Sequence, residues 1–74
     1  MKPLNLFVKE KRREANLTQE QFAERAGVAL TVLRKIEQGK ENVNLGKVNR
    51  VLKMFGHVLA PVKSQELGLK NETL

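Results

Sequence analysis

The sequence predicts an all-α fold of four short helices, followed by one short β-strand. Three observations lead to this fold class. Apolar residues recur at intervals of three and four along residues 4–55, which is the period of an amphipathic helix. Residues suited to begin or end helices divide this stretch into four parts. The pattern then changes over residues 57–62, a short apolar run that is too brief for a helix.

The first helix is expected over residues 4–15, and Asn16 is suited to end it. One face of this helix is apolar and carries Leu4, Phe7, Val8 and Ala15. Arg12 interrupts that face, so its guanidinium needs a fixed carboxylate partner, and Glu37 is the candidate. The alternative is that Arg12 extends its charged end into solvent.

The second helix has a complete set of start signals. Thr18 is a good N-cap and Gln21, three residues later, completes a capping box, so the helix should begin at Thr18 and end near Gly27. Ala23 falls where this helix would cross the next one closely. Gln19 lies in the first turn, where a helix N-terminus attracts phosphate. The alternative for Gln19 is an ordinary solvated polar residue.

The third helix is expected after Val28, and its two faces differ in chemistry. Leu33 and Ile36 can pack back on Phe22, Ala23 and Ala26 of the preceding helix. Ala29 stands at the N-cap position without a side-chain acceptor, which costs about 1 kcal/mol relative to Ser or Thr. The two helices and their turn form a small rigid frame that presents one helix to a groove. The outward face then carries Leu30, Thr31, Arg34, Lys35 and Gln38.

This outward face offers contacts of several kinds to DNA. Arg34 could pair with O6 and N7 of guanine, and Thr31 with a base edge or a thymine methyl group. Lys35 suits phosphate or guanine, whereas Leu30 offers apolar contact alone. Lys40 follows in a polar turn, where it would meet the nucleic-acid backbone; the alternative is a solvated loop lysine.

The fourth helix is expected over residues 45–55, with Asn44 as its N-cap and Gly56 at its end. Its inward residues are Leu45, Val48, Val51, Leu52 and Phe55. The apolar run at 57–62 contains Pro61, which excludes a central strand. Because nothing else in the chain has a strand pattern, we expect this run to pair with its copy in a second subunit. The alternative is a coil that covers the core. The dimer contacts would come from Val58, Leu59, Ala60 and Val62.

Composition limits the function classes. The chain has 74 residues, no cysteine and one histidine, so disulfides and thiolate metal sites are excluded. No nucleophile–base pair or metal-ligand cluster is evident, and we expect no enzyme, metal site or cofactor. No apolar run approaches the ~20 residues of a membrane span, and the N-terminus lacks a signal-peptide core. We therefore expect a cytoplasmic protein without a membrane partner.

Positive charge is concentrated in the helical part of the chain. The net charge is +6, and residues 1–53 hold twelve Lys and Arg against six Asp and Glu. This excess favours a polyanion as partner, although a merely soluble surface would account for the charge equally well. We expect residues 1–62 to form a helix-turn-helix DNA-binding domain that includes the dimerisation strand (57–62). Residues 63–74 are expected to form a flexible tail.

The spacing of many residues resembles the phage-repressor/Cro-like helix-turn-helix family, also described as the xenobiotic-response-element type. The matching positions are Arg12, Leu17, Thr18, Gln19, Phe22, Ala23, Gly27, Val28, Leu33, Ile36, Glu37, Gly39, Leu45, Val48, Leu52, Phe55 and Gly56. The resemblance covers about residues 4–56. It implies a compact lambda-repressor-like domain that binds a near-palindromic operator as a dimer, with its third helix in the major groove.

The same resemblance assigns roles to individual residues. The base-contacting positions would be Leu30, Thr31, Arg34 and Lys35. Gln19 and Lys40 match phosphate-contacting positions, and Arg12 and Glu37 match an interior ion pair. Ala29 and Leu30 depart from the polar residues often found at those two positions.

Within that family, the short apolar strand after the fourth helix and the run Gly39-Lys40-Glu41-Asn42-Val43 are similar to HipB-like antitoxins. This narrower resemblance implies an autorepressor of its operon that binds a HipA-like kinase toxin. The sequence therefore favours a double-stranded DNA-binding repressor. The alternative is a protein-binding module that mainly restrains a partner enzyme, with DNA binding secondary.

Overall fold

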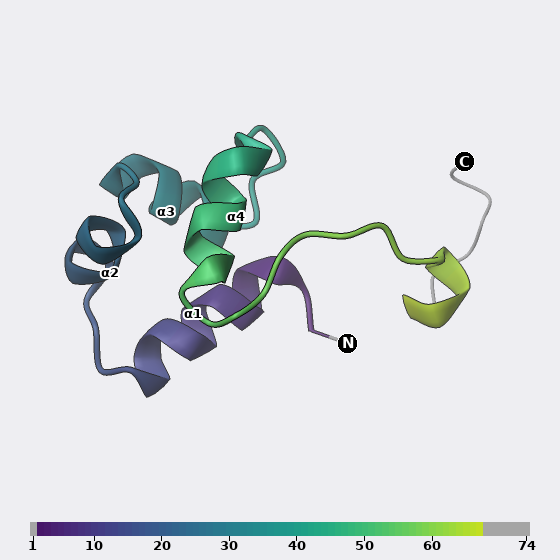
Figure 1. Ribbon diagram of the computed structural model, residues 1–74, viewed down its shortest axis with the longest axis horizontal. Helices are drawn as coiled ribbons and strands as arrows, with labels where there is room; N and C mark the ends of the chain where they lie inside the picture. Colours follow the sequence, from purple (N-terminus) through teal and green to yellow (C-terminus); the bar gives the residue numbers. More distant parts are fainter. Residues whose placement is uncertain (1, 68–74) are drawn as a thin grey trace.

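In the computed structural model, which describes residues 2–67, the chain is all-helical and its four α-helices pack around one core (Figure 1). The elements are α1 (Leu4–Glu14), α2 (Gln19–Ala26), α3 (Leu30–Glu37), α4 (Leu45–Lys53) and the 3-10 helix η1 (Ser64–Leu67). The predicted all-α class with four helices is confirmed, and no strand forms within residues 2–67.

Each of the four α-helices contributes to the core. Phe22 of α2 lies at the centre with no exposed surface, and its ring lies 5.3 Å from that of Phe55, just after α4. Full burial of one such side chain stabilises the fold by roughly 1.5–3 kcal/mol. The buried apolar residues are Val8, Phe22, Ala23, Leu33, Ile36, Val48, Val51 and Leu52.

Side-chain caps begin two of the helices. Thr18 Oγ1 accepts a hydrogen bond from the Gln21 backbone N–H at 3.1 Å, and the Gln21 side chain accepts one from the Thr18 N–H at 2.9 Å. This is the predicted capping box of α2. Asn44 caps α4 through the N–H of Lys47, whereas Ala29 gives α3 no side-chain cap. Both outcomes follow from the residue type at the cap.

All four α-helices end in the same way. The chain turns through a residue with positive φ, and two backbone hydrogen bonds reach back into the last turn of the helix. After α2, Gly27 has φ 72°, and its N–H and that of Val28 donate to Glu24 and Ala23. A glycine adopts this conformation without strain, which is why the first helix of the pair stops there. The corresponding residues elsewhere are Asn16, Gly39 and Gly56.

Two predicted helix ends and one predicted buried position were wrong. α1 ends at Glu14 and α4 at Lys53, so Ala15 and Phe55 belong to the turns that follow. Leu45 was expected to face inward but is 70% exposed. It shares a helical face with Val48, yet it is the first residue of α4, and burial on this face begins one turn later.

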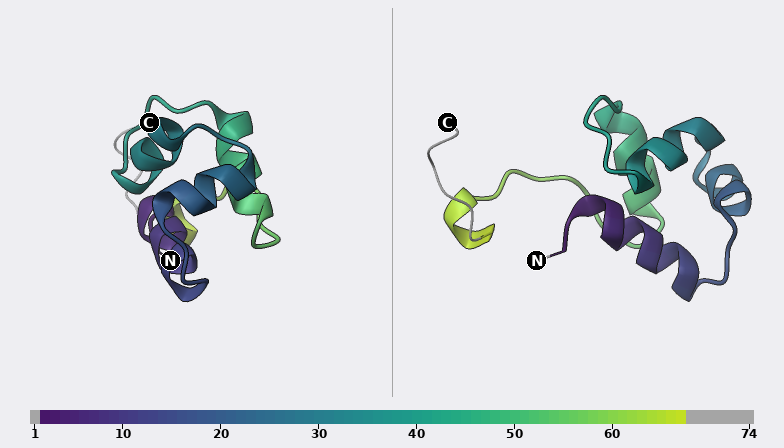
Figure 2. Two further views of the ribbon diagram at one scale, coloured as in Figure 1. Left: turned by 90° about the vertical axis from the view of Figure 1, so that its left-hand side faces the viewer. Right: turned by 180° about the vertical axis from the view of Figure 1, so that it is seen from behind.

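The chain after α4 is extended and leaves the helical body. It passes the N-terminal end of α1 and leads to η1, which lies away from the four helices (Figures 1 and 2). The strand predicted over residues 57–62 is not formed in this single chain, which supplies no neighbouring strand to pair with it. Of the predicted tail, residues 64–67 form η1, and residues 68–74 lie outside the described residues.

Candidate nucleic-acid interface

α2 and α3 form a helix-turn-helix in which α3 has one buried and one exposed face. Leu33, Ile36 and Glu37 are the buried residues of α3. The side chains that project into solvent are those of Thr31, Arg34, Lys35 and, at the helix end, Gln38. Three of the predicted base-contacting residues therefore lie together on an open face.

Leu30 differs from the other predicted base-contacting residues. It was expected on the outward face, but its side chain is half-buried and packs against the core cluster. It lies three residues before Leu33 and thus borders the same inward side of the helix. Leu30 therefore packs the start of α3 against the core. Less of its surface remains for an apolar contact with DNA.

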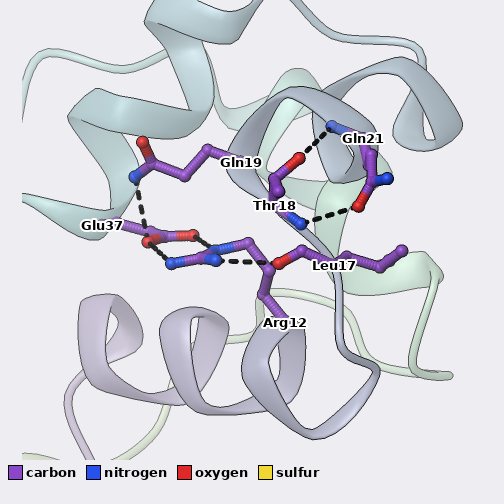
Figure 3. Close-up of polar contacts among 6 residues, drawn as sticks. All are labelled: Arg12, Leu17, Thr18, Gln19, Gln21 and Glu37. Carbon is purple, nitrogen blue, oxygen red and sulfur yellow. Dashed lines mark hydrogen bonds and ion pairs between the residues drawn. The ribbon is translucent and has the colours of Figure 1, made fainter.

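An ion pair fixes the C-terminal end of α3. Arg12 Nε donates to Glu37 Oε2 at 2.8 Å and Nη2 donates to Oε1 at 3.0 Å, a two-point contact that fixes the carboxylate plane (Figure 3). The third guanidinium nitrogen, Nη1, donates to the Leu17 carbonyl oxygen at 2.9 Å. The Arg12 side chain is 12% exposed and that of Glu37 is 2% exposed. The predicted interior pair is thus present, and Arg12 does not extend into solvent.

Gln19 joins this pair from α2. Its amide Nε2 donates to Glu37 Oε1 at 3.1 Å, so one carboxylate links α1, α2 and α3 (Figure 3). We expected phosphate or solvent as the partner of Gln19, and this bond was not predicted. A buried carboxylate has room for about four hydrogen bonds and Arg12 supplies two, which indicates a further donor but not which residue provides it. The second hydrogen of the Gln19 amide Nε2 stays available to donate to a phosphate at the N-terminus of α2.

This network positions α3 more than it stabilises the protein. A buried ion pair contributes little net stability relative to apolar residues, but removing one partner costs about 3–5 kcal/mol because the other charge is left buried. Among residues 2–67, no buried side-chain nitrogen or oxygen lacks a hydrogen-bond partner. The inward face of α3 is therefore completely satisfied, which leaves its outward face free for an external ligand.

Among the described residues, the exposed cations beside α3 form no ion pair. Within residues 2–67, the ion pairs are Lys2–Glu10, Lys11–Glu14 and Arg12–Glu37, none of which uses Arg34, Lys35 or Lys40. Lys40 is exposed, and its backbone N–H closes the end of α3 on the Lys35 carbonyl oxygen at 3.0 Å. This bond places the predicted phosphate-contacting lysine directly at the C-terminal end of the exposed face.

Glu10 of α1 has a lowered pKa. Lys2 donates a hydrogen bond to Glu10 and adds a nearby positive charge, which lowers the pKa of Glu10 below its ordinary value of 4.5. A carboxylate with a lowered pKa favours the folded state above that value, and the effect is lost as the pH falls through the lowered pKa. Glu10 is exposed, and this contact tethers Lys2 to α1 away from the exposed face of α3.

Two further searches bear on other functions. Within residues 2–67, no three His, Asp or Glu side chains gather in a way that could hold a metal ion. In the same part of the chain, no helix has both the length and the apolar character needed to cross a membrane.

Comparison with known protein families finds a match over most of the chain. A family model described as helix-turn-helix matches residues 8–58. The matched region starts at Val8, the buried residue of α1, and continues through α4 to Val58. No curated protein matches the sequence.

Proposed function

The chain belongs to the Cro/C1-type helix-turn-helix family of DNA-binding transcriptional regulators, and we propose that it is a repressor that binds a near-palindromic operator as a dimer. In this proposal α3 enters the major groove and reads base edges. The observation that carries the proposal is the contrast between the two faces of α3, one fixed by Glu37 and the other exposing unpaired cations.

Each exposed residue of α3 has a role that its chemistry fits. Arg34 is placed to make two hydrogen bonds to guanine, and Thr31 to contact a base edge or a thymine methyl group. Lys35 supplies charge toward guanine or phosphate. Leu30, being half-buried, would add a small apolar contact at the start of the helix.

Phosphate contacts at both ends of the helix pair would set the orientation of α3. Lys40 stands at the C-terminal end of α3, and Gln19 is the first residue of α2, where free backbone N–H groups attract an anion. Such contacts carry no sequence information but fix how the recognition helix enters the groove. Because Gln19 also bonds Glu37, a phosphate held there would be coupled directly to the position of α3.

The proposed dimer forms through residues 57–62. Val58 and Val62 are 68% and 49% exposed, which is unusual for valine in a small domain and suits a surface covered by a second copy. Leu59 and Ala60 complete the apolar run. A two-fold dimer would place its recognition helices about 34 Å apart, one turn of DNA.

A narrower proposal follows from the likeness to HipB-like antitoxins: the protein represses its own operon and binds a HipA-like kinase toxin. We propose no enzymatic activity for the chain itself. The competing function is a module that mainly restrains a partner enzyme. In that case a protein would co-purify, and changes in α4 or the tail would release it while Arg34→Ala would not.

Selection of bound duplexes from a random DNA pool at near-physiological salt tests the proposed function. We expect a two-fold symmetric consensus with half-site centres about ten base pairs apart. Weak, salt-sensitive binding without enrichment of any sequence would contradict the repressor proposal and favour the partner-binding module.

A further inference from the structure

Residues 57–62 are attached to the helical body along one edge. The backbone N–H of Leu59 donates to Asn49 Oδ1 of α4 at 2.8 Å, in a partly buried position. The Leu59 side chain is half-buried and packs against the core cluster, whereas Val58 and Ala60 on either side are exposed. The segment is therefore held at its second apolar residue.

This anchor determines which backbone groups remain free. In extended backbone, the N–H and C=O of one residue point to the same edge, and successive residues alternate between the two edges. In a strand over residues 58–62 that keeps the Leu59–Asn49 bond, the edge that faces Asn49 would contain Leu59 and Pro61, and the opposite edge would contain Val58, Ala60 and Val62. Within residues 2–67, no hydrogen bond engages the backbone N–H of these last three residues.

The position of Pro61 agrees with this division. Proline has no backbone N–H and interrupts a ladder of hydrogen bonds when it lies on the pairing edge. Here it falls on the edge that Asn49 already occupies, so the missing donor weakens nothing on the opposite edge. The opposite edge is complete over all three of its residues, which is the condition for adding a strand.

We propose that this free edge pairs with the same edge of a second copy, antiparallel and centred on Ala60. In that register Ala60 lies opposite Ala60 of the second copy, and Val58 lies opposite Val62. The inference rests on the dimer proposed above and adds its register. Among two-fold registers on this edge, centring on Ala60 uses the N–H and C=O groups of all three residues. Leu59 then stands opposite Pro61, at a position that needs no hydrogen bond.

The side chains of residues 58–62 also favour a second copy of the chain as the partner of this edge. Residues Val58, Leu59, Ala60 and Val62 all line an open apolar groove of about 720 Å³, whose other walls include Pro3, Leu4 and Phe7. Opposed valines are favourable cross-strand pairs. Residues 58–62 are uncharged, so no like charges stand opposite each other within the paired residues. A two-stranded ribbon is marginal alone, and burial over this groove would supply the missing apolar contact.

Cysteine crosslinking tests the register, because the chain has no native cysteine. Residues directly opposite in a hydrogen-bonded pair have Cα atoms about 5.5 Å apart, within disulfide range. Ala60→Cys should therefore convert under mild oxidation from monomer to covalent dimer on a non-reducing gel. Val58→Cys alone and Val62→Cys alone should not form a covalent dimer. In each case the two introduced cysteines of the dimer are four residues apart along the ribbon, a distance of about 14 Å. A mixture of these two variants should crosslink.

The outcomes separate the register from the dimer. Crosslinking of Ala60→Cys and of the mixture, but of neither valine variant alone, would establish the register. Strong crosslinking of Val58→Cys or Val62→Cys alone would overturn it in favour of a shifted pairing. Sedimentation of the reduced proteins as dimers without any crosslink would also overturn the register while leaving the proposed dimer and DNA binding intact. Monomers throughout would overturn both the register and the dimer.

Discussion

The helical body and the segment that follows it differ in how far they bury their apolar side chains and pair their polar groups. In residues 2–56 most of the large apolar side chains gather into one core, with Leu6, Leu45 and Met54 left exposed, and every buried polar side-chain atom has a partner. In residues 57–62 two valines are exposed, and one edge of the backbone is unbonded within the described residues. The core of the body forms within one chain, whereas we propose that the segment gains its partner from a second chain.

This difference separates two kinds of information in the sequence. Caps, turns and the core specify where α3 lies and what it exposes, all from contacts within the chain. In the proposed dimer, the segment would set how two such bodies are placed relative to each other. Binding of a symmetric operator would then need both parts, because each body would occupy one half-site and the dimer would set the distance between half-sites.

The largest expected effect comes from damaging the segment while sparing the body. Val58→Asp places a charge in the proposed ribbon and should give a monomer, which loses the advantage of binding two half-sites at once. That advantage is worth about 10²–10⁴ in affinity, so a titration with operator DNA should show a loss of this size. Helix content by circular dichroism should be unchanged, because Val58 is 68% exposed.

Val58→Thr is the matched control for that substitution. Threonine keeps the branched side chain that suits a strand and carries no charge, so its operator affinity should stay close to that of the wild type. Equal affinities for Val58→Asp and the wild type would show that the segment has no part in assembling the DNA-binding form.

The next largest effect concerns the body. Glu37→Ala leaves the Arg12 guanidinium without its carboxylate and removes the acceptor of Gln19, so we expect unfolding to become easier by about 3 kcal/mol. Glu41→Ala, an exposed acid four residues away, should change stability by less than about 0.5 kcal/mol. Urea unfolding of both variants measures the difference. Similar midpoints for the two would mean that the ion pair does not hold α3 in place.

A smaller effect is expected on the exposed face of α3. Arg34→Ala should weaken operator binding by roughly 1–3 kcal/mol and relax the preference at one base pair of each half-site. Lys40→Ala should instead weaken binding to all sequences alike and make it less sensitive to salt. Competition assays with mutated operators at several salt concentrations distinguish the two. An unchanged preference in Arg34→Ala would exclude this residue from base recognition.

The smallest expected effect is a gain in stability. Ala29 has the extended backbone of an N-cap, with φ −67° and ψ 148°, but no side-chain acceptor. Ala29→Ser should supply one and stabilise the fold by about 1 kcal/mol, as seen in thermal unfolding. Asn44→Ala, which removes the existing cap of α4, should cost a similar amount. No gain from serine would indicate that the first turn of α3 is already satisfied in another way.

Local signals made most of the fold predictable. Thr18, Gln21 and Gly27 define the limits of α2 through hydrogen bonds between near neighbours in sequence, and the structure contains those bonds. The prediction of burial failed at Leu45, because burial there depends on how far the neighbouring helices extend over α4. The period of α4 places Leu45 inward, but period alone does not indicate where the core ends.

The candidate site was predictable in part for the same reason. The exposure of Arg34 and Lys35 follows from the helical period, and Arg12 required an acid because it lies on an apolar face. The bond from Gln19 to Glu37 joins residues far apart in sequence, and neither residue type requires the other. The strand over residues 57–62 could not be decided from one chain, because a strand needs a partner that lies outside it.

Sedimentation velocity of the wild-type chain, alongside Val58→Asp, tests most directly the claim that the body is complete in one copy and the segment in two. We predict that the wild type sediments as a dimer and that Val58→Asp sediments as a folded monomer at the same concentration. A wild-type chain that stays monomeric at every concentration, or a Val58→Asp variant that remains dimeric, would contradict the claim.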